Sequence, residues 1–121
     1  MIETDNNNEI EIFSDSEKSM DRIIEMIEES SESVICMLFW IDSARFLKSL
    51  LKVGSDGRRV LLITDRRSID RLVESEISDS MKLLDGLPNC ETLVWDGRGL
   101  YHQKIIVIDG KTTIISLLEI K

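Results

Sequence analysis

The stretch His102-Gln103-Lys104-Ile105-Ile106-Val107-Ile108-Asp109 decides how this sequence is interpreted. Its four consecutive apolar residues predict a buried strand, and Asp109-Gly110-Lys111 predicts the turn of a hairpin. Residues two apart in an extended strand point to the same face, so His102 and Lys104 would project side by side. A neutral imidazole can act as a nucleophile or transfer a proton, and an ammonium beside it can hold a phosphate group. The pair therefore favours chemistry on a phosphodiester.

Helical and extended patterns alternate along the rest of the chain. Short apolar runs predict strands at residues 10–13, 34–41, 60–63 and 91–95, in addition to the strand of the motif. Apolar residues at helical spacing predict helices between these strands, over residues 14–29, 46–53 and 69–84. The run 34–41 is apolar throughout, which is typical of a strand covered on both faces. The pattern predicts an α/β domain whose mixed β-sheet is flanked by helices on both faces.

Length and composition indicate one globular domain. With 121 residues, 42% hydrophobic and 31% charged, the chain can form one core but not two. Residues 1–8 are polar and are expected to be disordered, which leaves residues 9–121 as the domain. The acidic start is unlike a secretory signal, and no apolar run is long enough to span a membrane. Cys36 and Cys90 lack the spacing of a metal site, so we expect reduced thiols and a cytoplasmic location.

The net charge of −8 argues against broad electrostatic attraction to nucleic acid. The charge is unevenly distributed, however. Residues 1–42 hold 12 acidic and 2 basic side chains, whereas residues 43–121 hold 11 acidic and 13 basic ones. The part of the chain that carries the motif is therefore slightly positive, and a substrate that bears phosphate is compatible with it.

The spacing H-x-K-x-x-x-x-D, together with the order of the predicted elements, resembles the phospholipase D superfamily in its single-motif branch of small nucleases. The resemblance extends from about Ile10 to Ile115. It implies that His102 attacks phosphorus to form a phospho-histidine intermediate, with Lys104 and Asp109 in the catalytic site. The family uses a second histidine as the general acid, and this chain has one histidine. The resemblance therefore implies a homodimer in which both His102 side chains meet at the twofold axis. It also implies metal-independent cleavage, most plausibly of nucleic acid, without a cofactor.

The segment after the motif departs from the family pattern. Where the family has Gly-Ser, and an Asn two residues beyond, this chain has Ser116, Leu117 and Glu119. Leucine donates no hydrogen bond, and a carboxylate that faced the site would repel phosphate. The resemblance leaves two alternatives: residues 9–121 are a C-terminally truncated piece of the domain, or the site is impaired. An impaired phospholipase D-like domain would be used for dimerisation or ligand sensing, for example in a transcription regulator. Phospholipid hydrolysis is a weaker alternative, because no membrane-binding segment is visible.

Further polar residues are candidates for substrate binding. Arg66 and Arg67 follow a predicted strand at its carboxyl end, where open α/β sheets tend to bind ligands, and Ser116 could donate to a phosphate. The more ordinary interpretation is a solvated loop for the two arginines and a half-exposed strand position for Ser116. Asp109 has a plain alternative as a turn residue, and Trp95 is expected in the core.

Overall fold

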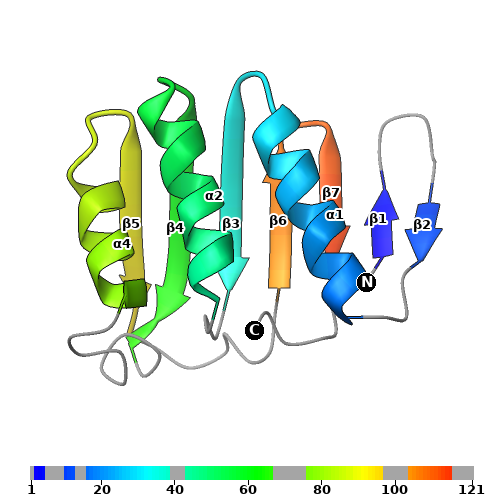
Figure 1. Ribbon diagram of the computed structural model, residues 1–121, viewed down its shortest axis with the longest axis horizontal. Coiled ribbons are helices and arrows are strands. Elements are labelled where there is room, and N and C mark those ends of the chain that lie inside the picture. Colours follow the sequence, from blue (N-terminus) through cyan, green and yellow to red (C-terminus); the bar gives the residue numbers. More distant parts are fainter. Residues whose placement is uncertain are drawn as a thin grey trace.

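The computed structural model describes residues 2–4, 10–12, 16–38, 43–66, 76–96 and 104–115. Within these residues a sheet is covered by helices, as Figure 1 shows. The strands are β1 (Ile2–Thr4), β2 (Ile10–Ile12), β3 (Ser33–Leu38), β4 (Arg59–Asp65), β5 (Cys90–Trp95), β6 (Lys104–Ile108) and β7 (Thr112–Ile115). The helices are α1 (Ser16–Glu29), α2 (Ala44–Ser55) and α4 (Glu76–Asp85).

The described strands form one mixed sheet in the order β2-β1-β7-β6-β3-β4-β5. β3, β4 and β5 run parallel to one another, because a helix carries the chain back between β3 and β4. β6 pairs with β3 in the antiparallel direction, so the motif strand lies beside the parallel half of the sheet. The predicted mixed α/β architecture is confirmed.

The three described helices all lie on one face of the sheet (Figure 1). Their apolar stripes meet the buried residues of the strands in a single core, whose fully buried members include Ile27, Phe46, Leu38, Leu62, Leu84 and Ile106. The sequence predicted helices on both faces, and within the described residues the second face has none. Side chains on that face, such as Leu93, are therefore exposed.

Two local features refine the sequence interpretation. β1 lies within residues 1–8, for which the sequence predicted no regular structure; three residues are too few to show an alternating pattern, and β1 is held by pairing with both β2 and β7. The predicted hairpin is confirmed. Asp109 (φ +56°) and Gly110 (φ +66°) are both left-handed, and the Lys111 N–H donates to the Ile108 carbonyl at 3.0 Å. This is the geometry of a type I′ turn, which matches the twist of its strands.

Gly54 marks the closest approach of α2 to β5. A Cβ atom on this residue would lie 2.5 Å from the Sγ atom of Cys90 and 3.2 Å from the Cδ1 atom of Leu87. Both contacts are shorter than ordinary van der Waals distances, so α2 packs at this depth only because residue 54 lacks a side chain.

Gly54→Ala should therefore lower the free energy of unfolding by about 1–3 kcal/mol, since overpacking forces neighbouring atoms apart. Denaturant unfolding measures the change. Gly86→Ala is the matched control, because a Cβ there would meet only ordinary contacts at 3.5 Å. Combining Gly54→Ala with Cys90→Ala should recover much of the loss. Equal stability of Gly54→Ala and the wild type would show that the neighbouring side chains move to accommodate the added methyl group.

Candidate functional site

Lys104 begins β6 and is buried, with 3% of its surface exposed. It pairs across the sheet with Leu38, which in turn pairs with Thr64, so the three residues share the face that the helices cover. They lie at the carboxyl ends of β3 and β4, and we call this end of the sheet the Lys104 edge. Ligands of open α/β sheets bind beyond the carboxyl ends of their strands. The structure thus places Lys104 where ligand binding is expected.

Other polar residues are buried at the Lys104 edge. Thr64 and Asp65 end β4 and are both almost fully buried, and the Thr64 hydroxyl has no hydrogen-bond partner among the residues that the structure describes. α2 begins at the same end of the sheet (Figure 1), and Ser43 caps it by accepting a hydrogen bond from the Phe46 N–H at 3.1 Å. The amino end of a helix carries partial positive charge that favours an anion. Sequence analysis missed Thr64 and Asp65, although two polar residues that end an apolar run were a usable signal.

Several predicted site residues lie outside the described residues. They are His102, Arg67 and Ser116, together with the departures at Leu117 and Glu119. The side-by-side projection of His102 and Lys104 therefore stays a prediction. Lys104, Arg66 and Asp109 are the predicted site residues that the structure describes, and it does not bring the three together.

Arg66 directly follows β4 at the Lys104 edge, as the sequence predicted. Its side chain is exposed, and its Nε atom lies 3.9 Å from Oδ1 of Asp96. A long, exposed ion pair of this kind holds the guanidinium weakly, so a phosphate could displace Asp96. Trp95 corrects an expectation: it is 47% exposed rather than in the core, because it lies on the face that the described helices leave open.

Asp109 lies at the opposite end of β6 from Lys104. The five residues of that strand advance about 3.3 Å each, which separates the two by roughly 16 Å. The Asp109 carboxylate accepts hydrogen bonds from three consecutive backbone N–H groups, those of Ser31 (3.0 and 3.1 Å), Glu32 (2.7 Å) and Ser33 (3.0 Å). The Ser31 hydroxyl donates a further bond at 3.2 Å. Asp109 thus ties the β6–β7 turn to the segment that leads from α1 into β3.

These hydrogen bonds set the ionisation of Asp109. Burial alone would raise the pKa of its carboxyl, but the bonds from the backbone of Ser31, Glu32 and Ser33 and from the Ser31 hydroxyl outweigh burial and lower the pKa below its ordinary 3.8. The ionised form is therefore the one that the fold stabilises. A group with a lowered pKa contributes stability above its unfolded value and loses it as the pH falls through the folded value.

Asp109→Asn should lower the free energy of unfolding by about 2 kcal/mol at pH 7, because the amide nitrogen cannot accept the bonds that the second oxygen accepted. Asparagine tolerates a positive φ, so the turn itself is preserved. The difference from the wild type should shrink as the pH falls below about 4, when the wild-type carboxyl also becomes protonated. Urea unfolding at several pH values measures this. A difference that does not depend on pH would refute the role of the charge.

The two cysteines are free and buried. Burial raises the pKa of the Cys36 thiol strongly, and burial also raises that of Cys90 against the opposing effect of a backbone hydrogen bond at Val60. Neither thiol is therefore an effective nucleophile at neutral pH. Within the described part of the chain, no three His, Cys, Asp or Glu side chains lie close enough together to hold a metal ion. None of the described helices is both long and apolar enough to cross a membrane.

Comparison with known proteins identifies the family. Residues 23–116 match the family described as "Cardiolipin synthase, PLD-like domain". The chain belongs to the phospholipase D-like family. The match includes the whole H-x-K-x-x-x-x-D stretch and ends at Ser116, before Leu117 and Glu119. No curated protein matches the sequence.

Two solved structures share the fold. NucT from Helicobacter pylori is 22% identical with a TM-score of 0.59, and the match covers 78% of this chain and 62% of NucT. TrmBL2, an archaeal chromatin protein described as showing a novel mode of DNA binding, is 17% identical with a TM-score of 0.61. That match covers 84% of this chain and 40% of TrmBL2. The chain therefore spans less than two thirds of the length of either protein.

Proposed function

We propose that this chain is a phospholipase D-like phosphodiesterase that acts on nucleic acid as a homodimer. The observation that carries the proposal is the burial of Lys104 at the carboxyl edge of the sheet, two residues after His102 in a chain of this family. The Lys104 ammonium lies at the edge where ligands of open α/β sheets bind, and an ammonium can stabilise the charge of a substrate phosphate. The DNA binding described for TrmBL2 supports nucleic acid as the source of that phosphate.

In the proposed reaction, His102 attacks phosphorus, a histidine–phosphorus bond forms and the bond to the leaving oxygen breaks. The leaving oxygen takes its proton from His102 of the second copy, which is why the chain, with one histidine, would act as a dimer. Water then gives a proton to His102 of the second copy, its oxygen attacks phosphorus, and the bond to the first His102 breaks. Lys104 would stabilise the negative charge that grows on the phosphate oxygens. Asp109, at the far end of β6, would contribute only by holding that strand in place. Arg66, Arg67 and Ser116 would bind substrate phosphates.

The proposal predicts phosphodiesterase activity that persists in EDTA and is abolished by His102→Ala. Lys104→Met should also reduce activity, about a hundredfold or more, because it removes the charge while keeping an apolar stem that can pack. Lys111→Met is the matched control, since Lys111 is exposed in the turn at the other end of β6. Cleavage of a fluorescent single-stranded oligonucleotide measures the rates. Activity that needs a metal, or that survives loss of His102, would refute the mechanism.

A second function, binding without catalysis, is favoured by the sequence after the motif. Leu117 and Glu119 stand where the family has phosphate-contacting Ser and Asn, so the domain could hold a ligand or a second copy without turnover. The likeness to TrmBL2, a chromatin protein, supports a role in DNA binding or regulation.

The two functions are separated by restoring the family residues. Leu117→Ser combined with Glu119→Asn should raise the rate of diester cleavage about a hundredfold, because one preorganised donor is worth ~3 kcal/mol in the transition state. Leu118→Ser in the unmodified chain is the control for a generic effect of this segment, because Leu118 stands between the two family positions. Full activity of the unmodified chain, with no gain in the double variant, would show that Leu117 and Glu119 do not face the site.

A further inference from the structure

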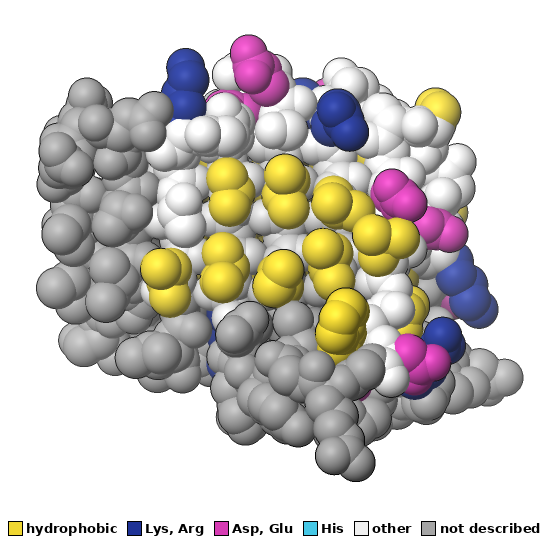
Figure 2. Space-filling model, turned by 180° about the vertical axis from the view of Figure 1, so that it is seen from behind, with side chains coloured by type: hydrophobic (Ala, Val, Ile, Leu, Met, Phe, Trp, Pro, Cys, Tyr) yellow, Lys and Arg dark blue, Asp and Glu magenta, His cyan; other side chains and the backbone are white. Residues whose placement is uncertain are grey.

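The face of the sheet opposite the described helices is apolar and open. Alternate residues of β6, β3, β4 and β5 point to it, and Figure 2 shows their side chains as a continuous group. We call this surface the open face; its apolar members are Ile35, Met37, Leu61, Ile63, Leu93, Trp95, Ile105, Val107 and Ile115. Several are substantially exposed, Leu93 at 43% and Trp95 at 47%. Parallel strands such as β3, β4 and β5 are normally covered on both faces, so this surface is expected to have a partner.

The size of the open face fits a protein contact. Strands lie about 4.8 Å apart and residues on one face repeat about every 6.8 Å, so five strands and four rows of side chains extend roughly 20 Å in each direction. Even as a flat area this is about 400 Å², within the range of surface patches that are functional in monomers. This is about half of the roughly 800 Å² that each partner buries in a standard interface, which is typical of a weak, reversible contact.

The rows of side chains are arranged so that the surface complements itself. Strand register defines four rows across β3, β4 and β5: Ser33 and Arg59; Ile35, Leu61 and Glu91; Met37, Ile63 and Leu93; then Asp65 and Trp95. A twofold axis perpendicular to the strands, midway between the second and third rows, would place Ile35 and Leu61 of one copy against Met37 and Ile63 of the other. It would also place Glu91 against Leu93 at the edge of the contact. The same axis would bring the first row of one copy against the fourth row of the other. Aligned sheets pack face to face about 10 Å apart, as this arrangement needs.

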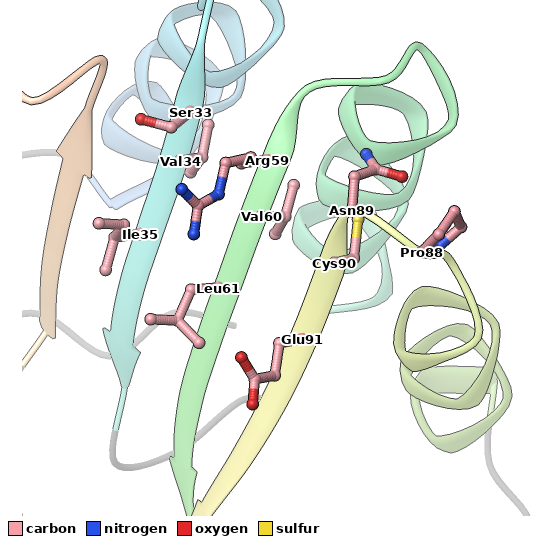
Figure 3. Close-up of a pocket in the computed structure, with 10 residues that line it drawn as sticks. All are labelled: Ser33, Val34, Ile35, Arg59, Val60, Leu61, Pro88, Asn89, Cys90 and Glu91. Carbon is pink, nitrogen blue, oxygen red and sulfur yellow. The ribbon is translucent and has the colours of Figure 1, made fainter.

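The end rows supply a reciprocal contact for that arrangement. A hollow of about 470 Å³ lies where the first two rows meet, lined by Arg59, Leu61, Ile35, Glu91 and their neighbours (Figure 3). The exposed indole of Trp95 lies in the row that the twofold axis brings over this hollow. Leu61 and Ile35 would offer it an apolar floor, and the Arg59 guanidinium could stack on its ring. Tryptophan and arginine are the residues that most often dominate binding at interfaces.

We propose that the open face binds a second copy of this chain, with Trp95 of each copy in the hollow beside Arg59 of the other. Each contact occurs twice, as an isologous interface requires. This pairing is distinct from a dimer that shares His102, because it leaves the two Lys104 edges at opposite ends. It stands on the open face alone and does not depend on the proposed function.

Charge sets how the association responds to salt. Each copy has a net charge of −8, so two copies repel each other, while the proposed contact is mainly apolar. Added salt should therefore strengthen the dimer. An association held mainly by ion pairs would weaken instead. Because the contact is smaller than a standard stable interface, we expect weak association with a micromolar dissociation constant.

Sedimentation equilibrium of the full chain, with and without added salt, tests the proposal. Leu93→Glu should weaken the dimer about tenfold or more, because the new carboxylate would lie against Glu91 of the other copy. Leu83→Glu is the matched control, because Leu83 is a 61% exposed leucine on α4, on the other side of the sheet. Circular dichroism confirms that both variants fold. A wild-type chain that stays monomeric at high micromolar concentration, or equal weakening by both variants, would overturn the proposal.

A double-mutant cycle tests the orientation. Arg59 and Trp95 lie three rows apart in one chain, roughly 20 Å, so they can couple directly only between copies. Arg59→Ala and Trp95→Ala should each raise the dissociation constant of the dimer. In the double variant, the increase should be smaller than the product of the two single increases. Fully independent effects would refute this orientation. His102→Ala should leave the dissociation constant unchanged; if it abolished the dimer, the association would be the one that shares the site, and the open-face proposal would be wrong.

Discussion

The antiparallel pairing of β6 with β3 is the constraint on which the rest of this structure depends. It joins the parallel half of the sheet to the half formed by hairpins, and it sets how far Lys104 lies from the carboxyl end of β3. A slip of one residue would turn Lys104 to the other face. The carboxylate of Asp109 resists such a slip, because it accepts hydrogen bonds from the backbone that leads into β3. Asp109 thus helps to fix the position of Lys104, which lies at the other end of the same strand.

The two ends of the sheet differ in how completely their polar groups are paired. At the amino end of β4, the Arg58 guanidinium donates to backbone carbonyls of Glu28 and Ser30, and the Asn89 side chain donates to the Gly54 carbonyl at 2.8 Å. At the Lys104 edge, the buried Thr64 hydroxyl has no hydrogen-bond partner in the described part of the chain, and the same holds for the Thr92 hydroxyl within β5. Leaving a buried polar group unpaired opposes folding by about 1–3 kcal/mol. The hydrogen bonds of Arg58 and Asn89 at the amino end of β4 offset this cost. The Thr64 hydroxyl at the Lys104 edge can therefore serve a ligand.

Sequence analysis predicted the order of the strands and helices well, because each apolar run or helical stripe is long enough to show its period. It also predicted the Asp109-Gly110 turn, where the backbone needs left-handed residues. Local patterns could not show which faces of the sheet the helices would cover, because the same apolar run is compatible with helices on one face or on both. For this reason Trp95 was expected in the core and lies exposed. Ile2–Thr4 has too little pattern of its own, and its pairing with β7 joins residues more than a hundred positions apart.

The candidate site was predictable in part. The spacing of His102, Lys104 and Asp109 led to the family, which comparison confirmed. The spacing did not show that Asp109 lies at the opposite end of β6 from Lys104 and binds the backbone of Ser31, Glu32 and Ser33, because only the tertiary fold gives its neighbours. Nor did it reveal the burial of Thr64 and Asp65, which depends on strands and helices distant in sequence.

The reactivity of Cys36 would report on local opening at the centre of the sheet. The residue lies in the middle of β3, paired with Leu62 on one side and Ile106 on the other, and it is fully buried. A thiol reagent can reach it only when the centre of the sheet opens, whereas Cys90 lies on the edge strand β5. The relative rates at which the two thiols are labelled would therefore compare local opening at the centre and the edge of the sheet.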